Sequence, residues 1–198
     1  LQILPFLSKA EEFALKGGTA INFFIRDLPR LSVDIDLTYL PVKGRKESLK
    51  EITQGIQRIA SEIEERIAHS RVKQQHSGGT LSKLIIQAGD AQVKLEVNTV
   101  LRGAIYGSKQ MVISPQVQQD FEMFVSVQSL RFEDLYGGKL CAALDRQHPR
   151  DLFDVRLLLN NEGITDGVRK AFIGYLISHS RPINELLHPN VLPIDQLY

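Results

Sequence analysis

The chain has 198 residues, 43% hydrophobic and 24% charged, which is typical of a globular protein because enough apolar side chains are present to offset the entropy lost on ordering. Lys and Arg total 24 and Asp and Glu total 23, a net charge of +1, so any nucleic-acid-binding surface must be local. No apolar stretch approaches the about 20 residues of a membrane span, and Cys141 is the single cysteine, which excludes an intrachain disulfide and favours a cytoplasmic location.

The N-terminal residues predict two short helices separated by a glycine turn. Leu4–Phe13 has the pattern of a short helix, and a second helical pattern covers Thr19–Ile25. Gly17-Gly18 lies between them and interrupts the regular structure. Pro29 ends the second helix, because the residue before a proline avoids the helical region.

A strand and the longest helix follow. Apolar and polar residues alternate over Ser32–Leu40, which predicts a half-buried strand with Asp34 and Asp36 on its polar face. Glu47–His69 then carries apolar residues at helical spacing, which predicts an amphipathic helix. Its apolar stripe contains Ile52, Ile56, Ile59, Ile63 and Ile67.

The middle of the chain predicts a hairpin. Arg71–Thr80 has the composition of a polar loop, and two strand patterns, Leu81–Ala88 and Ala91–Val100, flank the turn dipeptide Gly89-Asp90. Glu96 lies on the polar face of the second of these strands.

Residues 101–128 are irregular apart from a strand predicted at Phe124–Val127, and everything after them is helical in pattern. Ser129 is the predicted N-cap of a helix that runs to about Arg146. Further helices are predicted to begin near Pro149, Thr165 and Pro182. This order predicts an α+β fold, with a small mixed β-sheet and flanking helices in residues 1–128 and a helical C-terminal region, residues 129–198, packed on that core.

Three acidic residues on two predicted strands are the strongest sign of chemistry. Asp34 and Asp36 alternate along one strand and therefore share a face, with their backbones about 7 Å apart. Two carboxylates this close repel each other unless a cation compensates them, and hard oxygen ligands favour Mg²⁺ or Mn²⁺. Glu96 is the candidate third carboxylate, which would complete a site able to hold two metal ions.

The turn before these strands has the composition of a phosphate site. Gly17 and Gly18 let the backbone approach a phosphate closely, and Thr19 with the helix N-terminus adds N–H donors and a favourable dipole. Arg30 and Ser32, just before the Asp-x-Asp strand, are further candidates for nucleotide binding. Two readings of Arg30 stay open, a contact with phosphate or closure of the loop through a carboxylate.

Lys139 lies on the apolar stripe of its predicted helix, three residues from Tyr136 and four from Ala143. An ammonium there is costly without an anionic partner, and a bound triphosphate would supply one. Asp151 and Asp154 follow on one side of the next helix, near its start.

Each of these features also has a purely structural reading. An Asp-x-Asp pair is common on exposed strand faces, a Gly-Gly pair is usually a turn, and a single lysine often extends along apolar surface to water. Asp151 and Asp154 fit equally as helix-capping acids paired with Arg146 or Arg150. The combination of all these features in one order favours metal-dependent nucleotide chemistry.

Two separated blocks of sequence resemble the AbiEii/AbiGii-type toxin family of the DNA polymerase β-type nucleotidyltransferase superfamily. The first block is Ala14–Ala20 with Arg30–Leu37, and the second is Lys139-Leu140 and Ala143-Leu144 with Arg150–Asp154. The resemblance covers about residues 13–160 and implies a nucleotidyltransferase core that binds an NTP with Mg²⁺ and transfers a nucleotide. It also raises Asp151 to a candidate catalytic residue beside Lys139, with Asp154 as a weaker one.

The resemblance further implies a biological setting. Family members are typically the toxin of a two-gene toxin–antitoxin or phage-defence module, and some modify the acceptor end of tRNA. A cognate antitoxin and tRNA are therefore the implied partners.

The resulting hypothesis is an in-line attack of an acceptor hydroxyl on the α-phosphate of an NTP, with release of pyrophosphate. Asp34, Asp36 and Glu96 would bind the metals, and Glu96 is also the candidate base; Gly18, Thr19 and Lys139 would hold the triphosphate.

Two rival hypotheses stay open: a catalytically silent nucleotide- or RNA-binding module of the same fold, and a metal-dependent phosphohydrolase, against which the lack of His-Asp pairs argues. The basic segments Lys43–Lys50 and Arg71–Lys73 are read as solvated loops in preference to RNA-binding surfaces.

Overall fold

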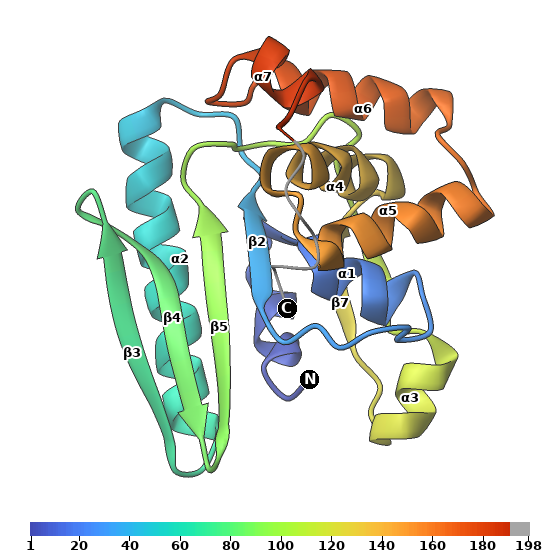
Figure 1. Ribbon diagram of the computed structural model, residues 1–198. Coiled ribbons are helices and arrows are strands. Elements are labelled where there is room, and N and C mark those ends of the chain that lie inside the picture. Colours follow the sequence, from blue (N-terminus) through green and yellow to red (C-terminus); the bar gives the residue numbers. More distant parts are fainter. Residues whose placement is uncertain (191–198) are drawn as a thin grey trace. The chain divides into compact units, whose positions relative to one another are not determined.

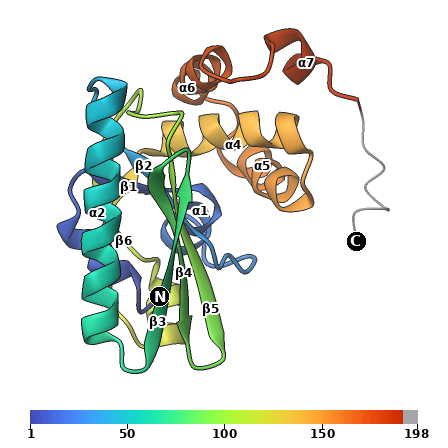
Figure 2. The same ribbon diagram turned by 90° about the vertical axis from the view of Figure 1, so that its left-hand side faces the viewer.

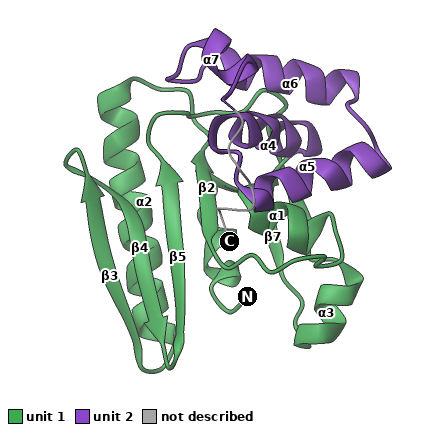
Figure 3. Cartoon of the chain, in the orientation of Figure 1, with its two compact units in different colours: residues 1–130 green, residues 131–198 purple. Residues whose placement is uncertain are grey.

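The computed structural model describes residues 1–190 (Figure 1). The chain divides into two compact units, residues 1–130 and the residues from Arg131 onward (Figure 3). Unit 1 contains the whole described sheet, and unit 2 is helical.

A mixed seven-stranded sheet in the order β3-β4-β5-β2-β1-β7-β6 forms the centre of unit 1. β2 runs parallel to β5 and β1 runs parallel to β7, whereas the other neighbours are antiparallel. The strands are β1 (Phe13–Lys16), β2 (Ile35–Tyr39), β3 (Ser70–Ser77), β4 (Thr80–Ala88), β5 (Ala91–Asn98), β6 (Ser108–Val112) and β7 (Ser126–Leu130). The mixed sheet with flanking helices confirms the predicted α+β fold class.

Helix α2 (Arg45–Arg66) covers one face of the β3–β5 part of the sheet, as Figures 1 and 2 show. Its predicted isoleucine stripe is confirmed for Ile52, Ile56, Ile59 and Ile63, which are buried, whereas Ile67 follows the end of the helix and is half-buried. Burial of each such side chain contributes about 1.5–3 kcal/mol, which fixes the helix on the strands. The remaining helices of unit 1 are η1 (Leu4–Lys9, a 3-10 helix), α1 (Gly17–Phe24) and α3 (Pro115–Phe121).

The hairpin around Gly89-Asp90 is confirmed as β4 and β5, but the predicted polar loop over Arg71–Thr80 is wrong. β3 pairs antiparallel with β4 along its whole length, through a turn at Gly78-Gly79 in which both glycines have positive φ. Because β3 lies at the edge of the sheet, its residues are mostly exposed and lack the apolar alternation that marks a half-buried strand.

The predicted cap at Ser129 is also wrong. Ser129 lies in β7, is fully buried, and donates from its hydroxyl to the Leu15 carbonyl oxygen of β1 at 3.1 Å. The helix begins instead at Phe132. At the other end of the unit, the predicted helix Leu4–Phe13 stops at Lys9, because Phe13 begins β1.

Unit 2 contains α4 (Phe132–Arg146), α5 (Pro149–Asn161), α6 (Asp166–Ile177) and α7 (Ile183–Leu187), which agrees with the predicted helices. Thr165, where a helix was predicted to begin, is the N-cap of α6, and its hydroxyl accepts from the Val168 N–H at 3.2 Å. Gly137 lets α4 cross α6 closely, because a Cβ there would lie 2.7 Å from the Ala171 Cβ. No helix within residues 1–190 combines the length and apolarity needed to cross a membrane.

Candidate functional site

The glycine turn at the start of α1 and the segment before β2 lie together in unit 1. The Thr19 hydroxyl donates to the Asp34 carbonyl oxygen and lies 3.1 Å from Ser32 Oγ. A Cβ on Gly18 would lie 2.8 Å from both Arg30 Nη2 and Ser32 Oγ. The structure therefore brings the predicted nucleotide-binding residues of this unit into one small region at the N-terminus of α1.

The three candidate metal-ligating carboxylates lie in the region where β2 and β5 run side by side. Asp36 of β2 is the direct neighbour of Glu96 of β5 across the parallel pair, so their side chains share a face. Asp34 comes two residues before Asp36, immediately before the first residue of β2. Asp36 also touches the glycine turn, because a Cβ on Gly17 would lie 2.7 Å from Asp36 Oδ2.

Two lysines that the sequence analysis did not single out compensate these carboxylates. Lys94 Nζ lies 3.4 Å from Asp34 Oδ2 and 3.6 Å from Glu96 Oε2, and Lys83 Nζ lies 3.3 Å from Glu96 Oε2. Lys94 lies two positions before Glu96 on β5 and therefore on the same face. That spacing is a signal in the sequence from which the contact of Lys94 with Glu96 could have been predicted. The contact of Lys83 could not have been predicted in this way, because it depends on the register between β4 and β5.

The electrostatics of this cluster favour a cation. Partial burial raises the pKa of Asp36 above its ordinary value; Lys16 and Lys94 oppose the rise, and the neighbouring charges of Asp34 and Glu96 add to it. A raised pKa means that the ionised form of Asp36 is under-compensated, so a further positive charge at this position would be stabilised.

The donor chemistry of the cluster fits a hard divalent ion, since three carboxylates supply oxygen ligands. The side-chain positions do not yet form a closed ligand set, because no three His, Cys, Asp or Glu side chains among residues 1–190 converge as a metal site. Asp34 and Glu96 instead face Lys94, and both are well exposed, at 45% and 38% of the side chain. Their exposure leaves them free to turn toward an ion. The register of β2 and β5 places Asp36 and Glu96 on one face, and Asp34 lies two residues before Asp36.

A Gly17→Ala substitution tests the contact between the glycine turn and Asp36. Gly17 has φ +72°, which strains an alanine, and the new methyl group would also displace the Asp36 carboxylate. Gly79→Ala is the matched control, because Gly79 has φ +80° and nothing within 4 Å of a built Cβ. Both variants should lose about 1–2 kcal/mol of stability in urea unfolding, but nucleotide transfer should fall at least about tenfold only in Gly17→Ala. Equal transfer rates in the two variants would contradict the contact's role.

The remaining candidates form a buried ionic cluster within unit 2. Lys139 of α4 is 6% exposed, and its Nζ lies 2.9 Å from Asp151 Oδ1 and 3.0 Å from Asp154 Oδ2, both on α5. Arg146 Nη2 adds a contact of 2.7 Å to Asp151 Oδ2. Lys139 does not extend to water, and its anionic partners are these two aspartates. Its predicted role in binding phosphate, like the catalytic role of Asp151, stays a prediction.

The chain is similar to a known protein family in sequence and to a solved structure in fold. The sequence model of a family described as "Nucleotidyl transferase AbiEii toxin, Type IV TA system" matches residues 1–197. No curated protein matches the sequence. Among solved structures, the chain is similar to MenT4, a nucleotidyltransferase toxin from Mycobacterium tuberculosis H37Rv, with a TM-score of 0.68 and 15% identity over 98% of this chain and 70% of that one. At this identity the structural likeness shows the fold.

Proposed function

The chain belongs to the AbiEii nucleotidyltransferase toxin family, and from this premise we propose that it transfers a nucleotide from an NTP to a hydroxyl of an RNA acceptor in a reaction that depends on a divalent metal ion. The observation that carries the proposal is the pairing of Asp36 with Glu96 across parallel strands, next to the Gly17 turn. Carboxylates beside a phosphate-binding turn are what phosphoryl transfer requires.

In this proposal Asp34, Asp36 and Glu96 hold Mg²⁺ or Mn²⁺, which when bound neutralises the triphosphate and lowers the pKa of the attacking hydroxyl. The Glu96 side chain is 38% exposed, and Glu96 is the residue we propose as base for the acceptor hydroxyl. The turn at Gly17-Gly18 presents backbone N–H groups at the start of α1, and the helix dipole favours a phosphate there.

Arg30 and Ser32 complete the nucleotide-binding side of the site, since both flank Gly18. A side chain on Gly18 would clash with both of them. We propose that Arg30 contacts the triphosphate, in preference to a purely loop-closing role.

Lys139 is proposed as a further ligand of the triphosphate, with Asp151 as the residue that positions it. Asp151 Oδ1 holds the Lys139 ammonium at 2.9 Å, which fixes its direction. An ammonium has three N–H donors, so contact with a phosphate does not require Lys139 to give up either of its two carboxylate partners.

The acceptor is proposed to be the 3′ end of tRNA, and the partner protein a cognate antitoxin. Both proposals rest on the family membership and not on a feature of the structure. Total RNA, which includes tRNA, is therefore the acceptor used to test the function.

The test of the proposed function is labelling of total RNA by each of the four α-³²P-labelled NTPs with Mg²⁺. The proposal predicts incorporation of label with one pyrophosphate released per transfer, and none after addition of EDTA. A catalytically silent module would label nothing, and a phosphohydrolase would release inorganic phosphate. Either result would overturn the proposed reaction.

A Lys94→Gln substitution tests how the carboxylates are compensated. Lys94 contacts both Asp34 and Glu96, so its ammonium repels an incoming divalent ion. A unit charge about 4 Å away is worth about 1 kcal/mol in water, or about fivefold in affinity. We expect tighter binding of Mn²⁺ to Lys94→Gln, measured by electron paramagnetic resonance. Lys50→Gln, an exposed position of α2, should leave the affinity unchanged; weaker binding in Lys94→Gln would make Lys94 part of the site rather than a competitor.

A further inference from the structure

The face of β3, β4 and β5 that turns away from α2 is an open polar surface. Leu84 and Ile86 of β4 are buried toward the helix side, so the alternate residues Lys83, Ile85 and Gln87 point to the other side. Figures 1 and 2 show α2 along one side of these strands, and the register of β3 and β5 identifies which of their residues share the open face.

The register arranges this face in three rows. The rows are Glu96, Lys83 and Gln75; then Lys94, Ile85 and Lys73; then Gln92, Gln87 and Arg71. Asp36 extends the first row at the inner end, since it pairs with Glu96. We call the nine residues of the three rows the open face.

Charge is distributed unevenly over the open face. The carboxylates lie at its inner end, at Glu96 and the adjoining Asp36, whereas the segment from Ser70 to Ala88 contains four basic residues (Arg71, Lys73, His76 and Lys83) and no acidic one. Of these, Arg71, Lys73 and Lys83 lie on the open face. Neither Arg71 nor Lys73 takes part in an ion pair found among residues 1–190, and both are exposed. Arg71 and Lys73 are therefore available to a ligand, whereas Lys83 and Lys94, which lie between them and the carboxylates, form ion pairs with Glu96.

We propose that the open face binds the sugar-phosphate backbone of the RNA acceptor, with its reactive end at Asp36 and Glu96 and the preceding phosphates along Lys83, Lys73 and Arg71. This inference rests on the proposed function, which it deepens by assigning a surface to the acceptor. The strand spacing of about 4.8 Å places β3 about 14 Å from β2. That span is sufficient for more than one phosphate.

The composition of the open face favours an RNA backbone over a protein partner. Protein interfaces are built around apolar and aromatic anchors, but Ile85 is the single apolar residue of the nine and none is aromatic. The three glutamine amides offer hydrogen bonds to phosphate and ribose oxygens. Contacts of this kind carry no base information, so binding along the open face is independent of sequence.

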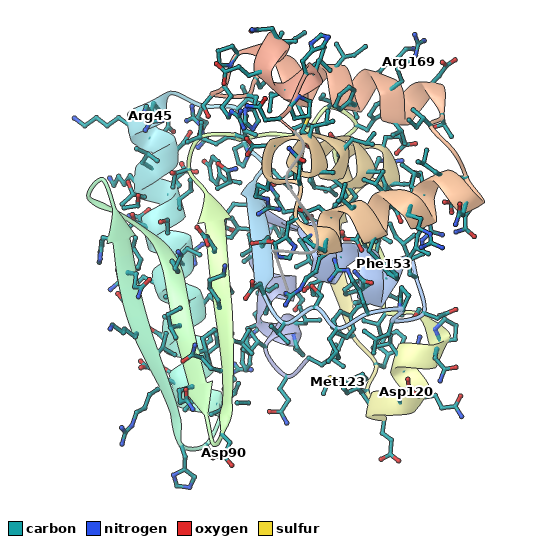
Figure 4. The ribbon with its side chains drawn as sticks, in the orientation of Figure 1. Arg45, Asp90, Asp120, Met123, Phe153 and Arg169 are labelled. Atoms are coloured by element: carbon teal, nitrogen blue, oxygen red, sulfur yellow. The ribbon has the colours of Figure 1, made fainter. Side chains whose placement is uncertain are left out.

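The experiment measures binding of a fluorescent tRNA mixture by anisotropy, in EDTA so that no transfer occurs, at several salt concentrations. The test variant is Arg71→Gln with Lys73→Gln. The control is Arg45→Gln with Lys46→Gln, which removes the same charge from exposed positions at the N-terminus of α2, where Figure 4 shows Arg45 pointing away from the strands.

The proposal predicts that the test variant binds tRNA about tenfold more weakly at low salt. It also predicts that the slope of log K against the logarithm of the salt concentration falls in magnitude by about 1 to 2. The control should bind within about twofold of the unaltered chain. Equal losses in both variants, unchanged binding in the test variant, or no binding of tRNA by the unaltered chain would each overturn the proposal. If the test variant instead loses binding to an acidic peptide and keeps its binding to tRNA, the surface belongs to a protein partner, and this result would overturn the proposal too.

The labelling assay separates this inference from the proposed function. If RNA is labelled normally and its binding does not depend on Arg71 and Lys73, only the proposal that the open face binds RNA is wrong. If no RNA is labelled but tRNA binding depends on these two residues, the open face stands as an RNA-binding surface and the transfer reaction is wrong.

Discussion

An Asp34→Ala variant should lose at least about a thousandfold in nucleotide transfer, or about 4 kcal/mol of transition-state stabilisation, because it removes one of three proposed metal ligands. Its fold should be unaffected. Asp34 precedes β2, and its side chain is 45% exposed and forms an ion pair with Lys94. Such an interaction is worth less than about 1 kcal/mol at an exposed site. The measurement is transfer rate alongside thermal unfolding.

Asp90→Ala is the control for this prediction. Asp90 lies in the exposed turn between β4 and β5, at the far end of the hairpin in Figure 4, and should retain full transfer. Retained transfer in Asp34→Ala, with unfolding unchanged, would remove Asp34 from the site.

A Lys139→Met variant should be destabilised by about 3–5 kcal/mol, because it leaves Asp151 and Asp154 buried without their ammonium partner. Urea unfolding at neutral pH measures this loss. Methionine keeps the apolar stem of the side chain, so the effect reports the charge rather than a cavity.

The triple variant Lys139→Met, Asp151→Asn, Asp154→Asn separates the two roles of Lys139. Removing all three charges should restore most of the stability, because no uncompensated carboxylate is left in the interior. If Lys139 also binds triphosphate, transfer should stay lost and the KM for NTP should rise in any residual activity. A stable triple variant with normal transfer would make the cluster purely structural.

Elements whose signal is local could be predicted from the sequence. The isoleucine spacing of α2 and the turn between β4 and β5 each define an element without reference to the rest of the chain. Edge strands could not be predicted in this way. β3 is exposed on most of its residues, and its pairing with β4 is visible only in three dimensions.

Ser129 shows how a local signal misleads. A serine followed by acidic residues is typical of a helix start, but pairing of β7 with β1 buries Ser129 against Leu15, more than a hundred positions earlier in the chain. Such non-local pairing overrides the local preference for a cap.

The same limit applies to the candidate site. The turn at Gly17-Gly18 and the alternation of Asp34 with Asp36 are local patterns, and the structure places them together. The ion pairs of Lys83 and Lys139 depend on the register of two strands and on the packing of two helices. The sequence indicated that Lys139 needs an anion and could not indicate that α5 supplies two.

Direct binding of Mn²⁺, followed by electron paramagnetic resonance in the presence of a non-hydrolysable ATP analogue, tests the central claim that Asp34, Asp36 and Glu96 form one metal site. We expect the unaltered chain to bind Mn²⁺ and Asp36→Asn and Glu96→Gln each to weaken binding at least about tenfold, whereas Asp90→Asn should not weaken it. Binding in Glu96→Gln as tight as in the unaltered chain would contradict this claim.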